Sequence, residues 1–353
     1  MTIHTFEVSA TLTNEDYYKI QYELKTKDQS KWKALKSGMH YWGLSDKGIL
    51  INMRQIKKKD FYSYKIIYRI SARRVIENDN FVGLFNIKNY DELEAEVNRV
   101  LNEKCSLLPN LKKCTLKRLD FCINAELGSQ EQVKAYIKIA KRSNVPGKLE
   151  VYTEYDKKAK RTKPTKDDYT VYSDGYIAIS IYNKYMEMKK QKDGVFPTSE
   201  MERAKNIVRM EIRCMEGKIK ALKKKYGIKS ISEFMRCGNK MGKELYNYYL
   251  GRIFNSGGIY TLKEALARID DSEYKPKNIE ILKEFISDAN ELRSVAKAAK
   301  FYKKAYGKDK VKQIYELLDN IDTNYVTVTN ADVKLFDNGY IPTPIELYKE
   351  YVS

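Results

Sequence analysis

The segments YIAISIYNKYMEMKK (residues 176–190) and NIVRMEIRC (residues 206–214) carry the patterns that decide the fold. In the first, isoleucine occupies every second position from 177 to 181, which is the side-chain period of a β-strand. The second also has the pattern of a strand, with apolar residues among charged ones. If the two strands pair, a hydroxyl, an amine, two carboxylates and two guanidiniums come together, those of Tyr182, Lys184, Glu187, Arg209, Glu211 and Arg213.

This polar cluster has two interpretations. Charged groups are costly to remove from water, so their convergence on neighbouring strands favours a functional site. A salt-bridged edge of a sheet explains the same residues without any function. The composition of the chain bears on the choice, because 66 lysines and arginines against 47 acidic residues give a net charge of +19. Such an excess predicts a polyanionic partner, most often nucleic acid, with an anionic membrane surface as the alternative.

Several classes of protein are excluded by what the sequence lacks. No apolar run is long enough to span a bilayer and no signal pattern begins the chain, which predicts a cytoplasmic protein without a membrane partner. Five cysteines without a CxxC pair argue against a zinc site or a disulfide framework. With only two histidines a Ser-His-Asp triad is not expected, and no GxxxxGK[ST] motif is present. The remaining chemistry uses carboxylates, a metal ion and a tyrosine.

The order of predicted elements repeats along the chain. Strand patterns over residues 4–12 and 115–124 are each followed by a capped helix and then by further strands. The last third has mostly helical patterns, with one short strand pattern over residues 325–329. With 353 residues the chain is long enough for two or three domains. We therefore expect an α+β protein with two sheet-and-helix units and a helical C-terminal domain, at residues 1–108, 109–228 and 229–353.

Basic residues of the two sheet units are candidates for contacts with a DNA backbone. In residues 61–75 (FYSYKIIYRISARRV), aromatic and basic side chains alternate along one predicted long strand, a pattern that suits phosphates and stacked bases. An ordinary solvated sheet face is the alternative. In the C-terminal region, residues 292–306 form a basic helix suited to a DNA groove or to a packing domain. The predicted DNA-binding residues of the sheet units are Arg54, Lys57, Lys58, Lys59, Arg69, Arg73, Arg118, Arg161 and Arg209.

Asp120 stands inside the strand pattern KRLDFCIN, where aspartate is disfavoured and therefore needs a reason. If this strand lies beside that of Glu211, the two carboxylates form a site for Mg²⁺ or Mn²⁺. Tyr182 would then be a nucleophile toward a phosphodiester, with Lys184 or Arg213 lowering its pKa and neutralising the transition state. The alternative for Asp120 is an ion pair with a nearby basic residue, Arg118, Arg209 or Lys117.

Three short motifs carry a resemblance to a known family. RLDFCIN (residues 118–124), ISIYNKYMEM (residues 179–188) and VRMEIR (residues 208–213) resemble motifs of rolling-circle replication initiators. The nearest groups are the Rep_trans plasmid initiators with their conjugative-element relaxases, and the filamentous-phage-type initiators. The resemblance implies an HUH-like (ferredoxin-like) sheet, a divalent metal, and nicking of one DNA strand at an origin by a tyrosine that stays covalently attached.

The resemblance also implies roles for individual residues. Asp120 and Glu211 match the acidic strand positions, Tyr182 and Lys184 match the tyrosine and lysine, and Glu187 matches the following acid. No His-hydrophobe-His triplet is present, so the three carboxylates would hold the metal. Tyr185 competes with Tyr182 as nucleophile, but in a regular strand it points to the opposite face.

The sequence thus predicts a replication initiator that nicks origin DNA in single-stranded or cruciform form. A relaxase for conjugative transfer begins with the same nick and is an alternative. A non-enzymatic origin- or operator-binding protein is the second alternative, and in it the carboxylates only form ion pairs. A host helicase and a second copy of the chain are further candidate partners.

Overall fold

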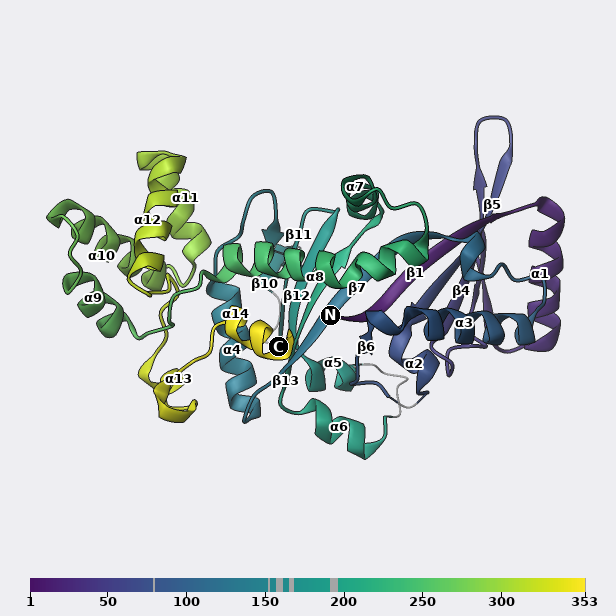
Figure 1. Ribbon diagram of the computed structural model, residues 1–353, viewed down its shortest axis with the longest axis horizontal. Coiled ribbons are helices and arrows are strands. Elements are labelled where there is room, and N and C mark those ends of the chain that lie inside the picture. The colour runs from purple at the N-terminus through teal and green to yellow at the C-terminus, as the bar shows by residue number, and fades with distance from the viewer. Residues whose placement is uncertain (79, 152, 157–160, 165–167, 191–195, 353) are drawn as a thin grey trace.

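The computed structural model describes residues 1–353 apart from 79, 152, 157–160, 165–167, 191–195 and 353 (Figure 1). Its centre is a sheet of 11 strands in which every neighbouring pair is antiparallel. The strand order is β2-β3-β4-β5-β1-β7-β13-β12-β11-β8, with β6 beside β1. The bounds are β1 Thr2–Leu12, β2 Trp32–Leu35, β3 Gly38–Tyr41, β4 Ile49–Lys57, β5 Tyr62–Ser71, β6 Phe85–Asn86, β7 Thr115–Glu126, β8 Glu150–Val151, β11 Tyr169–Ser173, β12 Ile177–Asn183 and β13 Ile207–Cys214. Strands β9 (Thr153–Asp156) and β10 (Arg161–Pro164) form a separate two-stranded sheet.

The predicted α+β class is confirmed. The strands that open the two predicted sheet units, β1 and β7, pair with each other in the middle of the sheet. One hydrophobic core runs from Ile3 to Phe254 and includes both units. Residues 1–108 and 109–228 therefore contribute to one continuous sheet rather than to two separate bodies.

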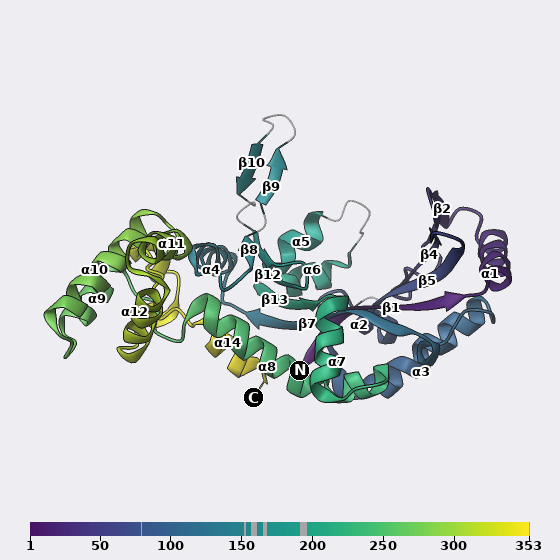
Figure 2. The same cartoon turned by 90° about the horizontal axis from the view of Figure 1, so that it is seen from above.

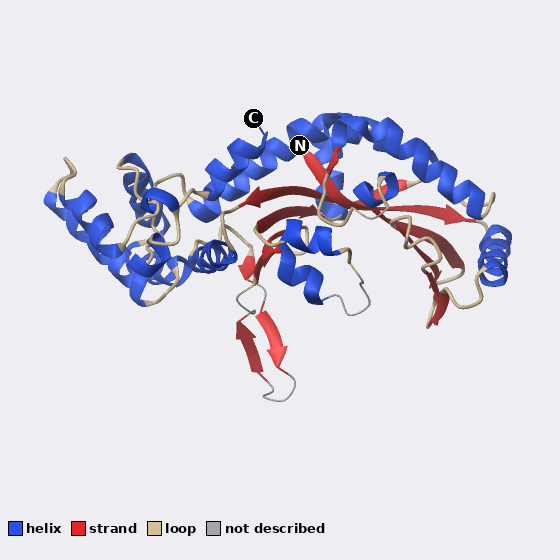
Figure 3. Ribbon diagram, turned by 90° about the horizontal axis from the view of Figure 1, so that it is seen from below, coloured by secondary structure: helices blue, strands red, loops and turns tan. Residues whose placement is uncertain are grey.

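The two faces of the sheet are covered differently (Figures 2 and 3). Helices α3 (Tyr90–Lys104), α7 (Glu216–Tyr226), α8 (Ile231–Phe254) and α14 (Pro344–Val352) lie over the convex face. Among the described residues, the concave face carries the short helices α5 (Lys184–Lys190) and α6 (Thr198–Ala204) and the β9–β10 hairpin. The concave face thus leaves the middle strands accessible.

Helix α8 lies close against the central strands. At Gly242, an added Cβ would come within 3.0 Å of a ring carbon of Phe121. The hydroxyl of Tyr246 donates to the carbonyl oxygens of Phe121 and Met210, at 3.2 and 2.6 Å. Because α8 packs on the apolar side chains of one face of β7 and β13, the alternation of the strands places Asp120, Glu211 and Arg213 on the concave face.

The predicted helical domain is divided between two cores. Helices α8 and α14 pack into the core of the sheet, because their apolar faces lie against β7. A second core gathers residues 259–341 with Ala135 and Ile139. It is built by α9 (Leu262–Asp270), α10 (Pro276–Glu291), α11 (Val295–Tyr306), α12 (Lys308–Asn320) and the short α13 (Asn330–Val333). The separate helical cluster is therefore smaller than residues 229–353.

Most predicted helix starts are confirmed by their caps. Thr13 caps α1 (Asn14–Lys27), Ser129 caps α4 (Gln130–Arg142), and Ser230 forms a capping box with Glu233 at α8. The remaining short helical segments are α2 (Ala72–Ile76) and the 3₁₀ turns Ile87–Asn89, Leu111–Lys113 and Asp337–Gly339.

Two predicted strands end earlier than expected. The strand expected over residues 61–75 stops at Ser71, where α2 begins. The strand expected to reach Tyr185 stops at Asn183, whose side-chain oxygen accepts a hydrogen bond from Met186 N at 3.1 Å and so caps α5. Lys184 and Tyr185 therefore lie on a helix. No helix among the described residues has the length and apolarity required to cross a bilayer.

The contact between β7 and α8 can be tested by Phe121→Ala. This side chain is fully buried. The substitution should lower the free energy of unfolding by about 3–5 kcal/mol, because it leaves a cavity that the core fills only in part. Tyr22→Ala, at a side chain that is 74% exposed, should change it by no more than about 0.5 kcal/mol. Urea unfolding of both variants measures the difference, and equal losses would contradict the packing described.

Candidate functional site

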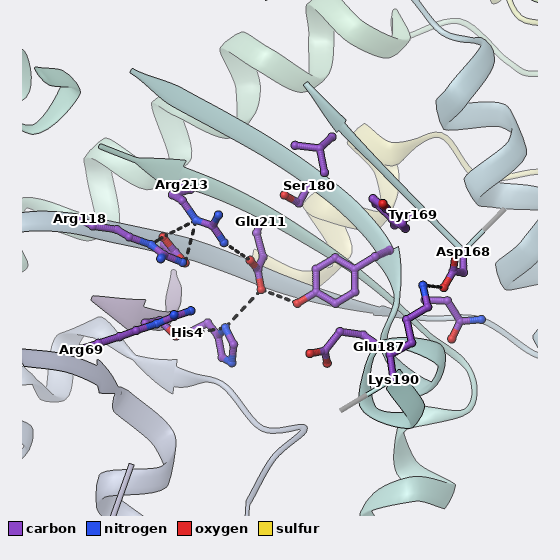
Figure 4. A pocket seen from close by; sticks show the side chains of 15 residues that line it. His4, Arg69, Arg118, Asp168, Tyr169, Ser180, Glu187, Lys190, Glu211 and Arg213 are labelled. Atoms are coloured by element: carbon purple, nitrogen blue, oxygen red, sulfur yellow. Dashed lines mark hydrogen bonds and ion pairs between the residues drawn. The ribbon is translucent and has the colours of Figure 1, made fainter. Parts of the chain in front are cut away.

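A pocket of about 280 Å³ opens on the concave face where β1, β7, β13, β12 and β11 lie side by side (Figure 4). It brings together four residues that the sequence predicted to converge, Asp120, Tyr182, Glu211 and Arg213. Glu187 also lines it. The residues come from strands that are far apart along the chain but adjacent in the sheet.

A row of alternating charges crosses the floor of this pocket from β5 to β13. Arg69 Nε lies 3.8 Å from Glu7 Oε1, and Arg118 connects Glu7 with Asp120 at 3.3 and 2.8 Å. Arg213 Nε then lies 3.3 Å from both oxygens of Asp120, and a terminal nitrogen of Arg213 lies 3.8 Å from Glu211. Asp120 and Glu211 are 1% and 4% exposed, so these guanidiniums provide the charge that makes their burial tolerable.

Glu211 is the point where the tyrosine and a histidine meet. The Tyr182 hydroxyl donates to Glu211 Oε1 at 2.5 Å, and His4 Nδ1 lies 3.3 Å from the same oxygen. Figure 4 shows His4 directed at this carboxylate from β1, and Tyr182 reaches the same oxygen from β12. Charge-assisted hydrogen bonds of this kind are short and strong, so the three side chains hold each other in place.

A β-bulge brings His4 into the pocket. Ile3 pairs with Phe121 and Phe6 pairs with Leu119, so His4 and Thr5 together lie opposite the single residue Asp120. An extra residue of this kind redirects side chains, and bulges are frequent beside functional sites. Both His4 and Thr5 line the pocket as a result.

The charges of the pocket shift the pKa values of its central pair in opposite directions. Burial alone would raise the pKa of Glu211, but the hydrogen bond from His4 and the charge of Arg209 hold it well below its usual value. Burial and then the negative charge of Glu211 raise the pKa of Tyr182 well above 10.0. The resting pair is therefore a carboxylate that accepts a hydrogen bond from a neutral phenol.

Two buried cationic side chains, those of Arg209 and Lys184, lie behind the pocket. Neither lies where the sequence predicted it. Arg209, predicted to bind DNA, is fully buried, and it donates to Asn124 Oδ1 at 2.8 Å and to the carbonyl oxygen of Val82. Lys184, predicted to share a sheet face with Tyr182, pairs with Glu187 at 2.8 Å from the first turn of α5. Burial and then the charge of Arg209 lower the pKa of Lys184. Arg209 therefore supports the site from inside the protein and does not reach its surface.

The competing tyrosine does not reach the pocket. Tyr185 packs beside Val82, Met188, Ala204 and Ile207 in a small separate cluster. Lys189 lies over its ring at 5.1 Å. Of the two candidates, only Tyr182 lines the pocket with Glu211.

The other predicted DNA-binding residues are spread along the first half of the sheet. Arg54 and the lysines at positions 57–59 are exposed at the end of β4 and in the turn before β5, where Lys58 lies 5.1 Å from the Phe61 ring. Arg69 and Arg118 line the pocket, and Arg73 pairs with Glu77 on α2. Arg161 lies in β10, and its side chain lies outside the described part of the structure.

The donors in the pocket fit a divalent cation in part. His4 and Glu211 place an imidazole nitrogen beside a carboxylate oxygen, a pair that Mn²⁺ accepts and that phosphate oxygens and water would complete. Asp120 fits less well than expected, because two guanidiniums neutralise it. Glu187 is engaged by Lys184. Within the described residues, no three histidine, cysteine or acidic side chains converge on one metal position.

Sequence reasoning missed several residues of the pocket. His4 was considered only as a member of a hydrolase triad, and a bulge leaves no pattern in a single sequence. Asp168 and Lys190 line the pocket and were not expected either. Glu7 was also missed: it does not line the pocket, but it pairs with Arg118, which does. Lys190 pairs with Asp168 at the rim of the pocket.

Comparisons with known protein families, with curated proteins and with solved structures give no match for this chain. The pocket and its charges are therefore the features of this chain that indicate a function.

The ion pairs of Asp120 can be tested by Asp120→Asn. The substitution leaves Arg118 and Arg213 without their buried counter-charge and should lower the free energy of unfolding by about 3 kcal/mol. Glu216→Gln is the matched control, because Glu216 pairs with Lys117 and Lys220 at the surface, and it should cost at most about 1 kcal/mol. Chemical denaturation distinguishes the two, and a similar small loss in both variants would contradict the role of Asp120.

The environment of His4 predicts a pH dependence of stability. Burial lowers the pKa of His4 below 6.5, although its hydrogen bond with Glu211 offsets part of the effect. As the pH falls below about 6.5, the unfolded chain takes up a proton at this position before the folded protein does, so the free energy of unfolding decreases. Between about pH 7.5 and 5.5 the wild type should therefore lose more stability than His4→Gln. Parallel curves for the two proteins would show that His4 titrates normally.

Proposed function

We propose that this protein cleaves one strand of DNA with Tyr182 as the nucleophile and remains joined to the DNA through a phosphotyrosine bond. The observation that carries the proposal is the Tyr182 hydroxyl held 2.5 Å from Glu211, in an accessible pocket bordered by Arg69, Arg118 and Arg213. Guanidiniums bind phosphate oxygens and stabilise the charge that develops during phosphoryl transfer. The net charge of +19 fits a DNA substrate.

In the proposed reaction the Tyr182 oxygen attacks the phosphorus and the bond from phosphorus to one sugar oxygen breaks. Glu211 is the acceptor of the hydrogen bond from the phenol and so is placed to take its proton. The released sugar oxygen leaves as a hydroxyl after it takes a proton from solvent. Because the phosphate ester is kept on the tyrosine, attack by a sugar hydroxyl reverses the reaction and rejoins a strand.

In the free protein the Tyr182 hydroxyl keeps its proton and is therefore a weak nucleophile. The raised pKa of Tyr182 and the lowered pKa of Glu211 both oppose transfer of the proton. A divalent cation, Mg²⁺ or Mn²⁺, held by His4 and Glu211 would supply positive charge to the phosphate and to the developing phenolate. Arg213 lies between Asp120 and Glu211 and is placed to contact the phosphate.

Initiation of rolling-circle replication at an origin is the biological role that best fits this reaction, and the motifs quoted above support it. Transfer of DNA by a relaxase uses the same step. Origin DNA with an unpaired segment is the proposed partner, because Tyr182 lies in a pocket that opens on the accessible concave face. A host helicase and a second copy of this chain are further proposed partners.

The proposal is tested with supercoiled DNA that carries the gene of this protein and its flanking sequence. Incubation with Mn²⁺ or Mg²⁺ should give a nicked circle and a protein-DNA adduct that survives denaturation. Tyr182→Phe should abolish both, and Tyr185→Phe should retain both. Glu211→Gln should slow nicking by about 100-fold or more, because a positioned proton acceptor is lost.

Two other outcomes are informative. An adduct that persists in Tyr182→Phe and disappears in Tyr185→Phe would keep the reaction and reassign the nucleophile. Absence of any nick or adduct with either metal, combined with tight and salt-sensitive DNA binding, would contradict cleavage. That result would instead support the non-enzymatic origin-binding alternative, in which the charged row of the pocket is structural.

A further inference from the structure

The helical cluster at the end of the molecule opposite β2–β4 carries a concentration of positive charge that the pocket does not use (Figure 1). Residues 293–312 contain eight lysines and arginines and one acidic residue, a net charge of +7 within the +19 of the chain. Lys297, Lys300, Lys303 and Lys304 of α11 are all exposed. None of these four lysines has a carboxylate at ion-pair distance among the described residues.

Two aromatic side chains are exposed on the same helix. Phe301 and Tyr306 are 63% and 56% exposed, which is unusual for rings of this size. Both rest on Tyr302, with ring centroids 5.9 and 5.6 Å apart, and Tyr302 is itself buried against Phe285 at 5.2 Å. The two exposed rings are therefore supported from beneath by the core of the cluster.

A cleft of about 510 Å³ lies beside these rings, between α9, α10 and α11. Phe301 and Tyr306 line one side of it, Leu266 contributes from α9, and Glu284 and Asp288 contribute from α10. Exposed aromatic rings and carboxylate acceptors are thus combined in one cleft, and the lysines of α11 lie outside its lining.

We infer that this cleft binds single-stranded DNA, with unpaired bases against Phe301 and Tyr306 and the sugar-phosphate chain along the lysines of α11. Stacking requires the flat face of a base, which duplex DNA does not expose. The carboxylates disfavour phosphates inside the cleft but accept hydrogen bonds from amino groups of bases, as acidic side chains do with the N4 amine of cytosine. The lysines on the outside of α11 attract the phosphates.

The carboxylates also give the cleft a preference among pyrimidines. Cytosine carries an amino group where thymine carries a carbonyl oxygen, which a carboxylate repels. The inference does not depend on the chemistry of Tyr182, because binding at α11 needs neither nucleophile nor metal.

The experiment uses the full-length Tyr182→Phe protein in the presence of a chelator, so that no cleavage can occur. Binding of fluorescent oligo(dC), oligo(dT) and a hairpin duplex is measured over a range of salt concentrations. We expect oligo(dC) to bind more tightly than oligo(dT). Phe301→Ala with Tyr306→Ala should weaken binding of oligo(dC) by about 10–100-fold, the effect of losing one or two stacking contacts. Photo-cross-linking to oligo(dC) followed by peptide mapping should label α11.

Charge is tested separately with a matched control. Lys300→Ala, Lys303→Ala and Lys304→Ala together should reduce the slope of log affinity against log salt for oligo(dC) by about 2. Lys220→Ala, Lys224→Ala and Lys229→Ala remove the same number of exposed charges near α7 and should leave the slope nearly unchanged. Equal effects of both triple variants, no effect of the aromatic variant, absence of an α11 cross-link, or tighter binding of duplex would each overturn the inference.

Discussion

The neutralisation of two buried carboxylates in adjacent central strands is the constraint on which the structure depends. Asp120 and Glu211 lie on the concave face of β7 and β13, where they are almost fully buried. Arg213 stands directly opposite Asp120 in the strand register and lies near Glu211 as well. A slip of one residue would turn these charges into the apolar layer beneath α8, so the ion pairs and the hydrophobic contacts specify the same register.

The same arrangement explains why the site is one-sided. Helix α8 covers the convex face so closely that a Cβ at Gly242 would lie 3.0 Å from a ring carbon of Phe121. The polar side chains of the site, those of Asp120, Tyr182, Glu211 and Arg213, therefore meet on the concave face, which the short helices α5 and α6 leave accessible. Arg209 and Lys184 are buried behind the site. The charge of Arg209 shifts the pKa values of Glu211, His4 and Tyr182, and the charge of Lys184 shifts that of His4.

The positive charge of the chain is distributed over more than one surface. Part of it lies along the concave face, at Arg54, Arg69 and the turn between β4 and β5. Another part lies on α11, where aromatic rings are exposed among the lysines. Since long-range attraction to a polyanion depends on the total charge, both surfaces would increase the rate of encounter with a polyanionic partner, whereas local geometry would determine what binds at each surface.

The sequence by itself determined the elements and the chemistry of the side chains. The α+β class, the caps of the helices and the strand character of residues 177–183 and 207–214 follow from local periodicity. The period of two also places Arg209, Glu211 and Arg213 on one face, so the meeting of Asp120, Tyr182, Glu211 and Arg213 could be expected once the strands were assumed to pair.

Only the tertiary structure decided how those strands are ordered and where the regular pattern is interrupted. The bulge that brings His4 to Glu211 arises from the pairing of β1 with β7, residues more than a hundred positions apart, and it leaves no local signal. The burial of Arg209 depends likewise on contacts with distant segments, such as the carbonyl of Val82. Periodicity is a property of neighbouring residues, whereas strand order, bulges and burial are set by pairing between distant ones.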